Sequence, residues 1–160
     1  MTNTANKLTV ADVKKFHARA DVRAAIASIK EARKHSERIT AHVDSYLDPA
    51  FAAFAPFYTA PTKRRNGGER ITARKDLFMC GDVGSEQCNE WFALCDELHR
   101  ANGYTDLEPG QCPALIAQHD ARKCEWALLS MVEELTGANF NANLELRAKV
   151  LELFLNPPMV

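Results

Sequence analysis

The chain has 160 residues and a net charge of −1, with 46% hydrophobic and 26% charged residues. This composition is typical of an ordinary globular protein and excludes a largely disordered chain. No apolar run is long enough to span a membrane, and the segment MTNTANKLTV lacks the basic and apolar regions of a signal peptide. We therefore expect one cytoplasmic domain, residues 1–160, with no membrane partner.

The charges are divided unevenly along the chain. Residues 1–75 hold 15 Lys and Arg against 7 Asp and Glu, whereas residues 76–160 hold 5 against 14. This segregation allows two interpretations. Either the two halves compensate each other within the fold, or the basic half binds nucleic acid while the acidic half faces a protein.

Helical periodicity organises the first third of the chain. The pattern from Thr9 to Asp12 is typical of a capping box and predicts a first helix. A change in apolar phase near Ala20–Asp21 predicts a break, with Asp21 as the next N-cap. The second helix is long, about residues 21–47, and Asp48-Pro49 is expected to end it.

A basic region follows a short, phenylalanine-containing helix predicted at Ala50–Ala55. We expect residues 59–75 to form a flexible loop rather than a hairpin, because they have too little apolar alternation to hold strands together. The loop and the long helix supply the candidate contacts to a nucleic-acid backbone, which is the alternative function. These residues are Lys63, Arg64, Arg65, Arg70, Arg74 and Lys75 of the loop, with Arg23, Lys30 and Lys34 of the helix.

Three further helices complete the predicted fold. One runs from Ser85 to about Ala101, with His99 at the edge of its apolar stripe. A central helix spans about 113–136, because Pro113 suits a first helical position and Gly137 suits the position after the end. The last helix covers about 142–155. The sequence therefore predicts an all-α, single-domain bundle of about five helices.

Cysteine and histidine residues raise the question of a metal. Five cysteines, an odd number, favour reduced thiols over a disulfide framework. Thiolate and imidazole are zinc ligands, so a structural zinc site is a second alternative, with candidate ligands Cys88, Cys95, His99 and Cys112. No CxxC pair occurs, and cysteine is often buried simply as a small hydrophobic residue. We expect no cofactor.

The central helix carries the leading functional hypothesis. Its wide apolar stripe is expected to face the core, whereas a narrower strip combines Leu115, Trp126 and Leu129 with His119 and Arg122. Trp and Arg are enriched at the centres of protein interfaces. Since no phosphate-binding loop, dinucleotide fingerprint or HExxH motif occurs, we predict a non-catalytic protein that binds another protein or itself. The competing interpretation is that Trp126 packs against the C-terminal helix as part of the core.

Overall fold

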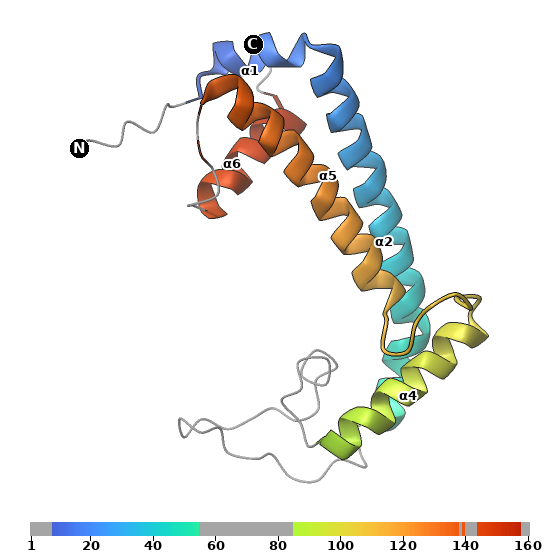
Figure 1. Ribbon diagram of the computed structural model, residues 1–160. Helices are drawn as coiled ribbons and strands as arrows, with labels where there is room; N and C mark the ends of the chain where they lie inside the picture. Colours follow the sequence, from blue (N-terminus) through green and yellow to red (C-terminus); the bar gives the residue numbers. More distant parts are fainter. Residues whose placement is uncertain (1–7, 55–84, 138, 140–143, 158–160) are drawn as a thin grey trace, which may run out of the picture. The chain divides into compact units, whose positions relative to one another are not determined.

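The structure, a computed structural model, describes residues 8–54, 85–137, 139 and 144–157. In these ranges the chain forms five α-helices and no strand (Figure 1), which confirms the predicted all-α fold. The predicted basic loop at 59–75 lies outside the described residues. None of the helices in the described ranges combines the length and the apolar content needed to cross a bilayer.

Helix α1 (Val10–His17) begins with the predicted capping box. The Thr9 hydroxyl accepts a hydrogen bond from the Asp12 N–H at 3.2 Å, and the Asp12 carboxylate accepts one from the Thr9 N–H at 2.9 Å. These bonds satisfy backbone donors that a helix start leaves without partners. Hydrogen bonds from Thr9 also lower the pKa of Asp12, because they stabilise its charged form.

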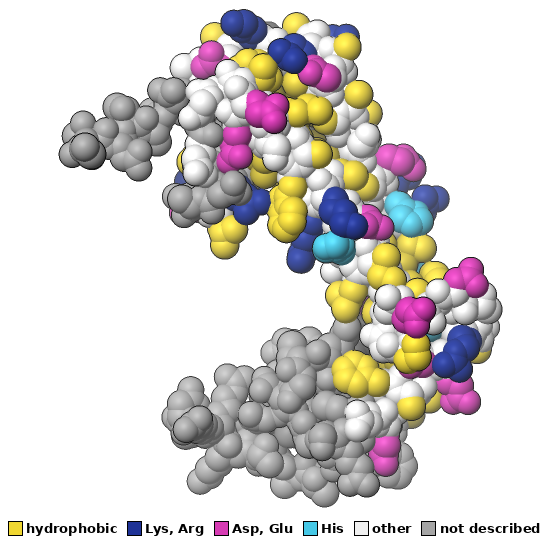
Figure 2. All heavy atoms as spheres, viewed as in Figure 1, with side chains coloured by type: hydrophobic (Ala, Val, Ile, Leu, Met, Phe, Trp, Pro, Cys, Tyr) yellow, Lys and Arg dark blue, Asp and Glu magenta, His cyan; other side chains and the backbone are white. Residues whose placement is uncertain are grey.

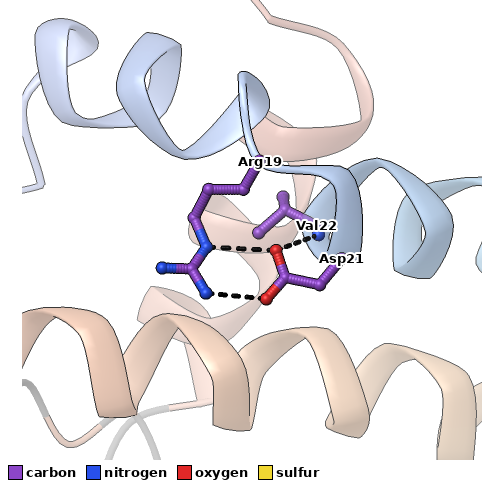
Figure 3. A network of polar contacts seen from close by, with 3 residues as sticks. All are labelled: Arg19, Asp21 and Val22. Atoms are coloured by element: carbon purple, nitrogen blue, oxygen red, sulfur yellow. Dashed lines mark hydrogen bonds and ion pairs between the residues drawn. The ribbon is translucent and has the colours of Figure 1, made fainter.

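The predicted break between the first two helices is confirmed, but Asp21 has a different position from the one expected. Helix α2 (Ala20–Phe54) begins at Ala20, so Asp21 lies in its first turn and is not the N-cap. Its carboxylate accepts hydrogen bonds from the Arg19 guanidinium at 3.0 and 2.7 Å and from the Val22 N–H at 2.9 Å (Figure 3). The bonds from Arg19 are the main reason that the pKa of Asp21 falls to about 2.

Helix α2 extends beyond its predicted end. It continues through Pro49 as far as Phe54. The prediction that Asp48-Pro49 ends the helix was therefore wrong. Of the short helix predicted at Ala50–Ala55, residues 50–54 form the last part of α2, and Ala55 lies outside the described residues. Tertiary packing explains the difference, because the rings of Phe51 and Phe54 lie 5.1 and 5.5 Å from the ring of Trp91. Such contacts offset the cost of a proline inside a helix.

The remaining helices lie close to their predicted positions. They are α4 (Ser85–Ala101), α5 (Pro113–Thr136) and α6 (Leu144–Leu155). Gly137 follows α5 with a φ of 68°, and its N–H donates to the Glu133 carbonyl at 2.8 Å. Glycine suits this position because it adopts the left-handed conformation without steric cost.

The chain divides into two compact units. Unit 1 comprises Met1–Ser36 and Ala117–Val160, and unit 2 comprises Glu37–Ile116. Helices α2 and α5 each contribute one part to unit 1 and the other part to unit 2. The single-domain expectation stays a prediction.

The core of unit 1 is mainly aliphatic, and the rings of Phe16 and His17 both stack on Phe154. Helix α1 packs against α6, where the Phe16 and Phe154 rings stack with centroids 6.4 Å apart. Helices α2 and α5 supply most of the other buried side chains. These are Val22, Ile26 and Ile29 of α2 with Leu128, Leu129 and Val132 of α5.

The core of unit 2 combines α2 and α4. Val43 and Leu47 of α2 pack with Trp91 and Cys95 of α4. His99 is also inside, at 2% exposure, although the sequence placed it at the edge of the helix stripe. A hydrogen bond between His99 and Tyr46 of α2 makes its burial tolerable.

Candidate functional site

Trp126 is a large apolar side chain left at the surface of unit 1. It lies on α5 and is 52% exposed. The guanidinium carbon of Arg147, from α6, lies over its ring at 5.7 Å from the centroid. This is cation–π geometry, which holds the indole at the surface and stabilises it modestly.

The other residues of the predicted partner strip have different environments. Leu129 is only 6% exposed and belongs to the core of unit 1. His119 and Arg122 are exposed on α5. Leu115 is 48% exposed and belongs to unit 2. Within unit 1, the open part of the strip is therefore His119, Arg122 and Trp126, with Leu129 beneath it.

A hollow of about 290 Å³ lies beside Trp126. Its lining residues are Trp126, Leu129, Ser130 and Glu133 of α5 with Arg147 of α6. Figure 2 shows hydrophobic side chains beside basic and histidine side chains over the middle of α5. The hollow is comparable in size to the smaller ligand pockets, about 300 Å³, and has room for an aromatic side chain.

Ion pairs neutralise some of the charged side chains of α5 and α6 but not others. Glu125 forms an ion pair with Arg33, with 2.7 Å between Oε1 and Nη2. Asp120 forms one with Lys123, with 3.2 Å between Oδ1 and Nζ. Arg122 and Arg147, by contrast, form no ion pair with any residue in the described part of the chain. Two guanidinium groups thus flank Trp126 without a bound carboxylate.

Arg147 and Leu144 were not among the predicted site residues. Leu144, also on α6, is 77% exposed. The sequence shows that both lie on a helix, but not that Arg147 contacts the indole of a residue 21 positions earlier. Only the packing of α6 against α5 makes that contact, so no local signal was available.

Three of the candidate metal ligands lie together in unit 2. Cys95, His99 and Cys112 line one cavity of about 30 Å³, which has room for about one water molecule. Nevertheless, the described residues contain no group of three or more His, Cys, Asp or Glu side chains arranged to hold a metal ion. The side chain of Cys88 lies outside what the structure describes.

His99 has a defined polar environment in that cavity. Its Nδ1 lies 2.7 Å from the Tyr46 hydroxyl, and its ring meets the rings of Tyr46 and Tyr104 edge to face. Burial lowers the pKa of His99, although the negative charge of Asp96 partly opposes the shift. Burial also raises the pKa of Tyr46. Both groups are therefore neutral near pH 7, and the hydrogen bond links α4 to α2.

The predicted nucleic-acid residues are only partly described. Arg23, Lys30 and Lys34 are exposed on α2, at a spacing that places them on one side of the helix. The basic residues of the 59–75 segment lie outside the described residues, namely Lys63, Arg64, Arg65, Arg70, Arg74 and Lys75. Contact with nucleic acid stays a prediction.

Comparisons with models of protein families, with curated proteins and with solved structures found no match to this chain.

Proposed function

We propose that this protein is a non-catalytic, cytoplasmic binding protein whose partner is another protein chain. The partner docks on the surface formed by Trp126, Arg122 and Arg147 with the adjoining hollow, which we name the Trp126 surface. The observation that carries the proposal is the half-exposed indole held under a guanidinium beside that hollow. Exposed aromatic and arginine side chains are the commonest energetic centres of protein interfaces.

The chemistry of the surface supports binding. An indole supplies a large apolar contact area at a low cost in conformational entropy, and the two arginines supply donors for carboxylate or carbonyl groups. The odd number of cysteines in the sequence, five, favours reduced thiols over a disulfide framework and thus supports a reducing compartment.

The test compares Trp126→Ala with a matched control, Leu144→Ala, which removes another exposed apolar side chain from unit 1. Because Trp126 is half-exposed, we expect its replacement to change the melting temperature by only a few degrees while abolishing capture of the partner from a cell extract. Leu144→Ala should retain capture. Equal recovery of the same proteins by wild type and Trp126→Ala would rule out the Trp126 surface as the docking site.

A further inference from the structure

The order of residues along the Trp126 surface is self-complementary. Arg122, Trp126, Leu129 and Glu133 follow one another at intervals of four, three and four residues, so they share one face of α5. The face begins with a cation, continues with two apolar residues and ends with a carboxylate. Arg122 and Glu133 are about 16 Å apart along the helix.

A two-fold axis between Trp126 and Leu129 would pair this face with its own copy. In an antiparallel arrangement, Trp126 lies opposite Leu129 of the second chain, and Arg122 lies opposite Glu133. Each chain then offers an exposed indole, and each offers a hollow beside Leu129 that has room for one. A parallel arrangement would instead place arginine on arginine and glutamate on glutamate.

We propose that the partner of the Trp126 surface is a second copy of this chain, with the two α5 helices antiparallel and each Trp126 seated in the other chain's hollow. This rests on the proposed function, since it names the partner of the same surface. Arg122 has no ion pair in the described residues, so its guanidinium can donate hydrogen bonds to a carboxylate of the second chain. Glu133 already has an interaction within its own chain, but it can also pair with Arg122 of the second chain because a carboxylate accepts several hydrogen bonds.

The charge order provides a stringent test by sedimentation equilibrium of the full chain over a wide concentration range. Wild type should form dimers. Arg122→Glu and Glu133→Arg should each raise the dimer dissociation constant about tenfold or more, because the two-fold axis repeats each altered contact. The double variant Arg122→Glu/Glu133→Arg should recover dimerisation, because its opposite charges again face each other.

Mixing the two single variants gives an independent readout. Arg122→Glu and Glu133→Arg should form a one-to-one dimer with each other more tightly than either forms with itself. Trp126→Ala should be monomeric, and circular dichroism should show that every variant retains its helical content. Failure of the double variant to recover, or dimers that ignore all these changes, would overturn the antiparallel pairing.

The oligomeric state of the wild type and the capture assay together distinguish self-pairing from binding of a different protein. A wild-type chain that stays monomeric at every concentration overturns self-pairing. If Trp126→Ala then still abolishes capture of a different protein, binding through the Trp126 surface stands. If Trp126→Ala affects neither association nor capture, both proposals fail.

Discussion

His99 is a buried imidazole whose environment favours its neutral form. Its Nδ1 shares a hydrogen bond with Tyr46, and aromatic rings cover its edges. A protonated imidazole would need water or an anion in place of these neighbours, which is why burial lowers the pKa of His99 despite Asp96. Burying this polar group is tolerated because Tyr46 supplies its hydrogen-bond partner.

The lowered pKa of His99 predicts that unit 2 loses stability in mild acid. The unfolded chain has a histidine pKa of about 6.5 and binds a proton before the folded chain does. The contribution of His99 is therefore complete above about pH 6.5 and declines as pH falls below that value towards the folded pKa. Unfolding can be followed through Trp91, which is buried in unit 2, after Trp126→Phe removes the other tryptophan. His99→Gln retains a hydrogen-bonding group but does not titrate, so its stability should fall less steeply as the pH is lowered. An equal loss of stability in both proteins would show that His99 is not the cause.

At the scale of elements, α2 contains a proline that its local sequence predicts should end it. Pro49 removes one backbone hydrogen bond and costs about 3 kcal/mol relative to alanine in a helix interior. The helix nevertheless continues to Phe54 because the segment after Pro49 packs on Trp91. Packing energy, which depends on a distant part of the chain, prevails over the local preference.

Pro49→Ala should therefore stabilise the protein by about 1–2 kcal/mol. Alanine gains about 3 kcal/mol in helix propensity. A more flexible unfolded chain cancels about 0.4–1 kcal/mol of this gain, and incomplete relaxation of the helix reduces the net stabilisation further. Chemical denaturation of the two proteins measures the difference. Pro49→Gly should show a smaller gain, since glycine is itself unfavourable in helices. A less stable Pro49→Ala protein would show that the fold depends on the proline.

The elements divide into those that local sequence signals predict and those that need tertiary contacts. The capping box at Thr9 and the pair Pro113 and Gly137 act within a few residues, so the starts of α1 and α5 and the end of α5 follow from the sequence. The burial of His99 and the position of Arg147 over Trp126 depend on which helices pack together. For the same reason, the sequence predicts the α5 strip as a whole but does not predict that Leu129 lies in the core while Trp126 lies outside it.

At the scale of the whole molecule, two compact units share the helices α2 and α5. Helix formation is cooperative, so loss of one part of a continuous helix weakens the part that remains. The chain, at 160 residues, is only slightly longer than the roughly 150 residues below which most single domains unfold in one step. These considerations favour cooperative unfolding of the two units, as expected for a single domain.

The two tryptophans make this prediction directly testable, because Trp126 lies in unit 1 and Trp91 in unit 2. In Trp126→Phe the fluorescence reports on unit 2 alone, and in Trp91→Phe it reports on unit 1 alone. Within each variant, we expect the fluorescence transition in denaturant to coincide with the loss of helical circular dichroism, which reports on all helices together. Comparing two signals within one variant removes any effect of the substitution on overall stability. Transitions at different denaturant concentrations would instead mean that units 1 and 2 unfold as separate domains, even though α2 and α5 run through both.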